Sequence, residues 1–428
     1  MTADAAAAPH VLVATVGSAG DLYPFLRVAR ELIARGHRVT MLGLVPHAAA
    51  AAAAGVPFVG LGTEAEYLAA LDDPDLWHPR KGFGALWRHL EPGLALLDEF
   101  VATLPADERC VLLAHPLALP GASLARARRP GLRIVAAWLA PTNLRSVHDP
   151  LVIGEWRLPR WLPLAARRAL WRLADATAID PVALPGLNAA RVRAGLPAAA
   201  HFIDDLQATP DASITLFPPW FAPTPPDWPR PLAEGAFPLF DPHREAALTP
   251  DLMRFLDGGA PPIVFTPGSG NRQAARGFER ALVATRRLGR RAIFLTPHRA
   301  QVPAALPPEV LWRPYVALAG LLPRVAAIVH HGGIGTTAEA LRAGTPQLIL
   351  ALAYDQFDNG ARVERLRAGA WLASRSARSR RLAAALAALL ASDAIRAGCA
   401  DVQRRVAADA RVELGAVVER LLGLAPRP

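Results

Sequence analysis

The chain has 428 residues, 52% of them hydrophobic, so it is too long for one typical domain and has enough apolar material for two cores. Its only cysteines, Cys110 and Cys399, predict neither a disulfide framework nor a cysteine metal site. The formal net charge of +10 comes from arginines spread along the whole chain. No nucleic-acid-binding motif accompanies them, so we expect no nucleic-acid partner, whereas attraction to nucleotide phosphates or an anionic membrane face stays open.

The sequence favours neither export nor a membrane span. The opening residues, MTADAAAAPH, lack the basic segment of a secretion signal and lead directly into an apolar run. No run of about 18 apolar residues free of charge occurs, so no transmembrane helix is expected. These features predict a cytoplasmic protein.

The first half of the chain alternates between strand and helix patterns. An apolar strand at 11–16 is followed by a glycine turn at 17–21 and by a helix with apolar residues at helical spacing from Leu22 to Ile33. Further strands are predicted at 37–44, 110–114, 133–139 and 213–217. The β-α-β order indicates a parallel, doubly wound sheet, which is an α/β fold.

A proline-rich stretch at 218–231 interrupts this pattern, which then starts again. Predicted strands follow at 262–266, 292–296, 326–330 and 346–350, with a helix near 274–287 and helical residues at the carboxyl end. We therefore expect a first domain at 1–222, a linker at 223–242, a second domain at 243–405 and a final helix at 406–428 that packs back toward the first domain.

The stretch 326–344 has the pattern of a phosphate site. A buried strand enters a helix through a glycine-rich turn, so free N–H groups and the positive end of the helix dipole are directed at one spot. The candidate ligands there are His331, Gly333, Gly335, Thr336 and Thr337. The alternative is an ordinary turn with ordinary helix caps.

Other polar residues extend this candidate site. Glu339, just inside the helix, is placed to reach a ribose hydroxyl, and Asp355 with Gln356 follows the strand at 346–350, where a carboxylate and an amide can hold sugar hydroxyls. Ser269 lies in a second glycine turn after a strand, and Tyr315 is a candidate for stacking on a nucleobase. A plain turn for Ser269 and simple packing for Tyr315 are the alternatives.

Asp21 and the segment 156–174 each have two interpretations. Asp21 stands at the start of the first helix, either as a helix cap or as a general base at the mouth of the first sheet. The segment 156–174 interleaves tryptophans with arginines, either as an amphipathic contact with the inner face of the cytoplasmic membrane or as a helix packed on the core with a basic outer face.

Taken together, these motifs resemble the family 1 glycosyltransferases of GT-B architecture, in the bacterial branch that acts on sterols and secondary metabolites. The resemblance rests on GSAGDLYPFLRVARELIARGHRVT at the start and on HHGGIGTTAEALRAGTPQ with DQFDN later. Within that branch the sequence resembles the rhamnosyltransferases of rhamnolipid synthesis most, in DDPDLWHPRKGFGALW and LFPPWFAPTPPDWPRPLAEGAFPLFD. The expected fold is two Rossmann-like domains facing a cleft, with the acceptor bound by the first and the nucleotide sugar by the second.

This resemblance assigns a role to each candidate residue. Asp21 matches the catalytic base, and Glu339 matches the ribose ligand. The diphosphate loop is matched by His331, Gly333, Thr336 and Thr337, with Ser269 opposite, and the sugar ligands are matched by Asp355 and Gln356. Tyr315 lies near the base-stacking aromatic, but Ala317 and Leu318 stand where the family has Pro and Gln. His330 is an alternative to His331 for the diphosphate contact.

The implied reaction moves a hexose from dTDP-rhamnose or a UDP-hexose to a hydroxyl of a lipophilic acceptor, with inversion. The acceptor is a hydroxyalkanoyl lipid or, alternatively, a sterol or secondary metabolite. Neither a metal nor a cofactor is expected, because the helix end and His331 would meet the charge of the leaving diphosphate. Two other classes stay as alternatives. A nicotinamide oxidoreductase would need GxGxxG after the first strand, which is absent, and a non-catalytic lipid-binding protein would not need Asp355 or His331.

Overall fold

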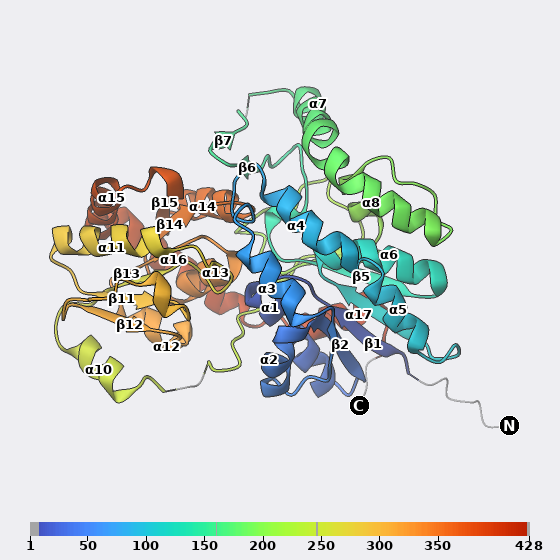
Figure 1. The fold of residues 1–428 in the computed structure, drawn as a ribbon, viewed down its shortest axis with the longest axis horizontal. Coiled ribbons are helices and arrows are strands. Elements are labelled where there is room, and N and C mark those ends of the chain that lie inside the picture. Colours follow the sequence, from blue (N-terminus) through green and yellow to red (C-terminus); the bar gives the residue numbers. More distant parts are fainter. Residues whose placement is uncertain (1–7, 160, 245–246, 426–428) are drawn as a thin grey trace.

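The computed structural model describes residues 8–159, 161–244 and 247–425. These residues form two lobes, each built on a parallel β-sheet that is covered by helices (Figure 1). The arrangement confirms the predicted α/β class and the two doubly wound halves.

The first sheet has seven parallel strands in the order β3-β2-β1-β4-β5-β8-β9. They are β1 (His10–Ala14), β2 (Val39–Leu44), β3 (Phe58–Leu61), β4 (Cys110–Ala114), β5 (Arg133–Trp138), β8 (Ala212–Thr215) and β9 (Leu232–Ala233). The helices of this half are α1 (Ala19–Ala34), α2 (Ala48–Ala53), α3 (Glu64–Asp72), α4 (Gly82–Leu90), α5 (Leu96–Thr103), α6 (Leu119–Arg128), α7 (Leu164–Ala174), α8 (Asp180–Arg193) and α9 (Phe202–Ala208). Both faces of the sheet are covered, so Leu12 of β1 enters one apolar core while Val11 and Val13 enter the other.

The second sheet has six parallel strands in the order β12-β11-β10-β13-β14-β15. They are β10 (Ile263–Thr266), β11 (Ala292–Leu295), β12 (Val310–Arg313), β13 (Ala327–His330), β14 (Gln347–Ala351) and β15 (Gly369–Ala373). The later helices are α10 (Pro250–Asp257), α11 (Ala275–Leu288), α12 (Leu318–Leu321), α13 (Ile334–Ala343), α14 (Gln356–Arg365), α15 (Ser379–Ala391), α16 (Asp393–Asp409) and α17 (Leu414–Leu422). Here Phe265 enters one core and Val264 the other, as in the first half.

The segments between and after the two sheets contact the first half. Strand β9 lies inside the predicted linker 223–242 and pairs with β8. Helix α16 runs through residue 405 to Asp409, and α17 lies against α1 among the elements of the first half (Figure 1). There the backbone N–H of Gly415 donates to Glu31 Oε2 at 2.6 Å. The boundaries at 222, 242 and 405 stay predictions.

The segment 156–174 combines features of both interpretations. Strand β7 (Trp156–Arg157) pairs with β6 (Val152–Ile153) as a hairpin, and α7 follows. Trp171 is buried, under the guanidinium of Arg145, but Trp156 is 82% exposed and Trp161 is 80% exposed. The part of the segment at residue 160 lies outside the described residues. The helix is therefore packed through Trp171 while two tryptophans before it face outward.

No single helix among the described residues is long and apolar enough to cross a membrane. Helices α15 and α16 reach that length and composition only as a pair, and they are bent by 69° at their junction.

Candidate functional site

The candidate site lies where the carboxyl ends of the two sheets meet. In each sheet the strand order reverses beside the first strand of the half, β1 or β10, and ligands of open α/β sheets bind at such points. The loops after these strands are in contact. A Cβ added to Gly270, after β10, would lie 3.6 Å from Ser18 Cβ, after β1, and 3.6 Å from Trp77 Cζ2.

Asp21 occupies the first turn of α1 and faces this junction. Ser18 is the N-cap, and it forms a capping box with Asp21, so Asp21 is the partner of the cap and not the cap itself. The N–H of Ser18 donates to Asp21 Oδ2 at 2.7 Å, and the Ser18 hydroxyl donates to the same oxygen at 3.1 Å. Gly17 has φ 127, and a Cβ there would lie 2.3 Å from Asp21 Oδ2, so only glycine fits this approach. The turn therefore fixes the orientation of the Asp21 carboxylate, and Ser18 donates hydrogen bonds to its Oδ2 atom.

His115, directly after β4, holds the other oxygen of Asp21. Its Nε2 lies 3.3 Å from Asp21 Oδ1, while its Nδ1 accepts the backbone N–H of Leu117 at 3.1 Å. Since Nδ1 is an acceptor, Nε2 carries the proton and donates to Asp21. Burial alone would raise the pKa of Asp21, but the hydrogen bonds from His115 and Ser18 lower that pKa below its ordinary value. We did not single out His115 from the sequence, although its place after the strand next to β1 is a usable signal.

The predicted phosphate cradle follows β13. Gly333 is the N-cap of α13, Gly332 has φ 99, and Gly335 is exposed in the first turn. Cβ atoms added to Gly268 and Gly333 would each lie 2.5 Å from the ring of His331, so both glycine loops close around this imidazole. Its Nδ1 is buried without a hydrogen-bond partner, and burial lowers the pKa of His331 to about 4, which keeps the ring neutral. A neutral ring with a free nitrogen at a helix start suits a diphosphate oxygen.

The other polar residues of this turn differ in whether their hydrogen-bonding atoms are engaged within the protein or lie near solvent. His330 is buried in the strand, where Nε2 contacts Gln347 Oε1 at 2.9 Å and Nδ1 accepts the N–H of Gly332 at 3.1 Å, so both ring nitrogens are engaged. Thr337 is fully buried, and its hydroxyl donates to the Gly333 carbonyl at 3.0 Å. Half-buried Thr336 and exposed Ser269 have hydroxyls nearer to solvent.

Glu339 and Tyr315 both contact residues at or just after the end of the predicted linker 223–242. Glu339 Oε1 pairs with Arg244 Nη1 at 3.3 Å, and its Oε2 pairs with Arg342 Nε at 2.6 Å. The hydroxyl of Tyr315 donates to Asp241, and its ring packs edge-on against His243, with centroids 5.8 Å apart. The candidate ribose and base ligands therefore share one wall, formed by residues 241–244.

Asp355 and Gln356 follow β14, as predicted, and they stand at the start of α14. Burial raises the pKa of Asp355 to about 7, although Asn359 Nδ2 donates to its carboxylate at 2.7 Å. The negative charge of Asp21 also raises this pKa, which means that the two carboxylates, one from each half, lie within electrostatic reach. The side-chain oxygen Oε1 of Gln356 accepts hydrogen bonds from the N–H groups of Leu352 and Ala353 at 2.8 and 3.2 Å. The Gln356 side chain therefore also stabilises the turn.

Two aromatic residues join the halves beside this pair. Tyr354 has φ 55, an uncommon conformation for a non-glycine residue, and its hydroxyl donates to the carbonyl of Leu76 at 2.6 Å. The ring of Trp77 packs edge-on against Tyr354 with centroids 5.8 Å apart. Neither was a sequence candidate. Within the described ranges, no group of three or more His, Cys, Asp or Glu side chains is arranged to hold a metal ion.

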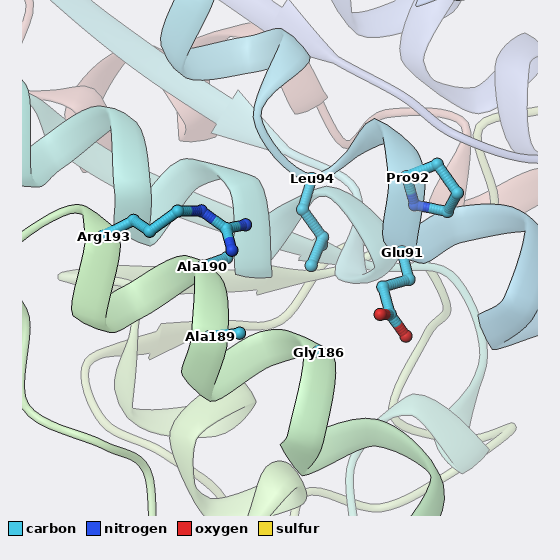
Figure 2. A pocket seen from close by; sticks show the side chains of 7 residues that line it. All are labelled: Glu91, Pro92, Leu94, Gly186, Ala189, Ala190 and Arg193. Carbon is cyan, nitrogen blue, oxygen red and sulfur yellow. The ribbon is translucent and has the colours of Figure 1, made fainter.

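A separate hollow of about 240 Å³ lies in the first half, between α8 and the turn η2 (Glu91–Gly93). Figure 2 shows Arg193 on one side of it and Glu91 on the other, with Leu94 between them. None of the candidate site residues lines it, so the junction of the two sheet ends remains the site of interest.

Comparison with known proteins gives matches over both halves. The model of the erythromycin biosynthesis protein CIII-like C-terminal domain matches residues 291–422, and that of the glycosyltransferase family 28 N-terminal domain matches residues 11–92. The O-mycaminosyltylonolide 6-deoxyallosyltransferase of Streptomyces fradiae is 30% identical over 380 residues, which cover 83% of this chain and 84% of that protein. The vancomycin aglycone glucosyltransferase of Amycolatopsis orientalis is 29% identical over 368 residues, covering 84% and 85%.

The fold is shared with a solved structure, the glycotransferase of kitacinnamycin. That structure matches with a TM-score of 0.71 and 22% identity, covering 97% of this chain and 99% of that chain. The likeness confirms the two Rossmann-like domains of the GT-B architecture.

Proposed function

The chain belongs to the GT-B glycosyltransferases of the family 1, macrolide and glycopeptide type, and we propose that it transfers a hexose from a nucleotide-diphosphate sugar to a lipophilic acceptor with inversion. One observation carries this proposal. Asp21 of the first half, held by Ser18 and His115, and half-buried Asp355 at the start of α14 in the second half are close enough that the charge of Asp21 raises the pKa of Asp355. A base for the acceptor and a ligand for the donor sugar are the two groups that such a transfer must bring together.

Asp21 acts as the general base of this mechanism. The acceptor hydroxyl gives its proton to Asp21 as its oxygen attacks the anomeric carbon, and the nucleoside diphosphate leaves from the opposite face. The hydrogen bonds of His115 and Ser18 keep the carboxylate ionised and oriented. His115 acts through its contact with Asp21 and so is a positioning residue.

The cradle stabilises the departing diphosphate. The start of α13, with Gly335 in its first turn, supplies N–H groups and the positive end of the helix dipole. His331 adds a hydrogen bond as a neutral ring, and Thr336 and Ser269 add hydroxyls. With this charge balanced by the protein, we propose that transfer needs no divalent cation; full turnover in excess chelator is expected.

The rest of the donor is held along α13 and α14. Glu339 binds the ribose, Tyr315 lies against the base, and Asp355 with Gln356 binds sugar hydroxyls. Their clustering on the second half supports a nucleotide sugar, either dTDP-rhamnose or a UDP-hexose. Thr337 contributes through the geometry of the turn, because its hydroxyl already donates to Gly333.

For the acceptor, we propose a lipophilic alcohol: a hydroxyalkanoyl lipid of the rhamnolipid kind or a polyketide or peptide aglycone. Two of its sequence relatives act, by name, on O-mycaminosyltylonolide and on the vancomycin aglycone, which supports an aglycone as acceptor. The exposed Trp156 and Trp161, with arginines nearby, support a contact with an anionic lipid surface from which such a compound is taken.

A matrix of labelled nucleotide sugars and acceptors, with products identified by mass spectrometry, tests the proposal. Calorimetry with UDP and dTDP tests the donor site separately. If the protein binds neither nucleoside diphosphate, the transferase proposal fails, and the lipid-binding alternative would then be favoured by vesicle binding without turnover.

A further inference from the structure

The segments that follow four adjacent strands carry a row of polar side chains at the carboxyl edge of the first sheet. In the order of the strands β3, β2, β1 and β4, these are Tyr67, His47, Asp21 and His115. Neighbouring strands are about 4.8 Å apart, so residues on adjacent loops of this edge lie near one another. His115 and Asp21 belong to the base described above. The other two residues of the row, His47 and Tyr67, lie on the β2 and β3 side of Asp21. Neither has a role in the mechanism described above.

His47 is unusual among the buried histidines. It ends the short turn η1 (Val45–His47) after β2 and is 6% exposed, yet neither of its ring nitrogens has a hydrogen-bond partner. The other fully buried histidines are each engaged: His10 with Glu108 and Thr40, His37 with Glu419, His115 with Asp21, and His330 with Gln347. A buried polar group without a partner is costly and calls for a ligand or a water.

Tyr67 and Asp21 both lie near His47. The ring of Tyr67, on α3, packs edge-on against His47 with centroids 5.7 Å apart. The charge of Asp21 acts on both His47 and Tyr67, so all three share one region. Burial lowers the pKa of His47, so the imidazole is neutral and offers one N–H donor and one nitrogen acceptor.

We propose that His47, backed by Tyr67, binds a second oxygen of the acceptor, close to the hydroxyl that Asp21 deprotonates. This inference rests on the proposed function and specifies its acceptor. A hydroxyl or carbonyl oxygen is a suitable hydrogen-bond partner for a neutral imidazole whose two ring nitrogens are unpaired. The preferred acceptor therefore carries a hydroxyl flanked by another oxygen, as a 3-hydroxyacyl chain or a polyketide diol does. A sterol, with one isolated hydroxyl, leaves His47 without a partner.

Matched acceptors and the His47→Phe variant test this. One pair is methyl 3-hydroxydecanoate and decan-3-ol; a polyketide macrolactone with neighbouring oxygens and cholesterol form a second pair. The wild-type protein is expected to prefer the oxygen-flanked member of each pair by at least tenfold in kcat/KM, because an unpaired buried group strongly disfavours the analogue that lacks its partner. In His47→Phe that preference should fall at least tenfold, and in Tyr67→Phe by less.

The thermal stability of His47→Phe is an independent measurement. Replacing an unpartnered buried imidazole by a phenyl ring of similar shape should leave Tm unchanged or raise it, whereas a histidine with a structural partner would show a fall. His148→Phe, at an exposed histidine of the same half, is the matched control. A fall in Tm for His47→Phe alone overturns the assignment.

The kinetic outcomes separate this inference from the proposed function. Equal kcat/KM for both members of a pair, an unchanged preference in His47→Phe, or transfer to no oxygen-flanked acceptor overturns the role of His47. Binding of UDP or dTDP and slow hydrolysis of the nucleotide sugar by the same samples show that the donor half works. Loss of these donor reactions would instead count against the transferase itself.

Discussion

Asp21 is a single residue whose properties are set by a neighbour distant in sequence. Burial raises the pKa of Asp21, and the hydrogen bond from His115 lowers it. Because His115→Phe removes this hydrogen bond, the pKa of Asp21 should rise in that variant. Asp21 must be ionised to accept a proton. With the donor saturating, the acid limb of kcat/KM for the acceptor should therefore lie below the ordinary pKa of an aspartate in the wild-type protein, and it should move to higher pH in His115→Phe. His115→Gln, whose amide N–H can replace the donor, should restore part of the profile. Identical acid limbs in all three proteins would remove His115 from this role.

The Asp21→Asn substitution separates the base from the donor site. We expect a loss of turnover of about 10²–10⁴-fold, the usual contribution of a general base, with little change in the affinity for UDP or dTDP. Single-turnover kinetics and calorimetry on the same preparation measure the two effects. Normal turnover by Asp21→Asn would exclude Asp21 as the base.

Asp355 should make donor binding depend on pH. Its carboxyl, with a pKa of about 7, is protonated below that pH and becomes a carboxylate above it, and a carboxylate accepts more sugar hydroxyls. We therefore expect nucleotide-sugar affinity to rise as the pH increases through 7, and Asp355→Asn to lose this dependence. Because the charge of Asp21 raises this pKa, the rise should shift to lower pH in Asp21→Asn. Calorimetry from pH 5.5 to about 8.5 tests both expectations; a flat wild-type profile would contradict them.

At the scale of elements, the buried strands could be predicted and the marginal ones could not. The predicted strand at 110–114 coincides with β4, and those at 292–296 and 326–330 match β11 and β13 to within one residue, because both faces of these strands are apolar. The edge strands β3, β12 and β15 were missed, since they are partly exposed and have weaker apolar runs. Strand β9 is two residues long and follows prolines, so no pattern marks it.

The residues of the candidate site likewise include some that the sequence predicts and some that it does not. The glycine turn after β13 and the acid at the start of α14 carry recognisable patterns, whereas His47, His115 and Tyr354 are single residues whose relevance arises from contacts across the sheet edge. One sequence without spatial neighbours gives no signal for such contacts.

The hairpin β6–β7 and helix α7 carry the proposed lipid contact. Replacing both exposed residues, as Trp156→Ala with Trp161→Ala, should reduce binding to vesicles of anionic phospholipid by at least tenfold, because each indole contributes apolar area at the interface. Co-sedimentation measures this, with Val192→Ala on α8 as an exposed apolar control. Equal binding by the double variant and the wild-type protein would leave the tryptophans without this role.

At the scale of the whole molecule, the last helix connects the end of the chain to its beginning. Glu419 of α17 is 2% exposed and holds Arg35 at 2.6 Å and His37 at 2.6 Å, whereas Glu413 is 77% exposed and reaches Arg35 at 3.5 Å. Glu419→Gln should lower the free energy of unfolding by more than Glu413→Gln does, because the Glu419 carboxylate is buried and contacts both Arg35 and His37. Glu413→Gln should change it by less than about 1 kcal/mol. Urea unfolding of both variants tests the difference, and equal losses would contradict it.

The pH dependence of this contact has a defined sign. Hydrogen bonds from Arg35, with burial opposing them, lower the pKa of Glu419. The stabilisation that Glu419 contributes is therefore fully present above the pKa of this carboxyl in the unfolded chain, about 4.3. It is lost as the pH falls through the lowered pKa of the folded protein.

The return of α17 to α1 affects how hybrid enzymes of this family can be assembled. A chimera that exchanges the second half for that of a relative by one crossover in the linker would also exchange Leu414–Leu422. It would therefore replace the residues that contact Arg35, His37 and Glu31. Two crossovers are needed, one in the linker and one between α16 and α17, so that the last helix is inherited together with the first.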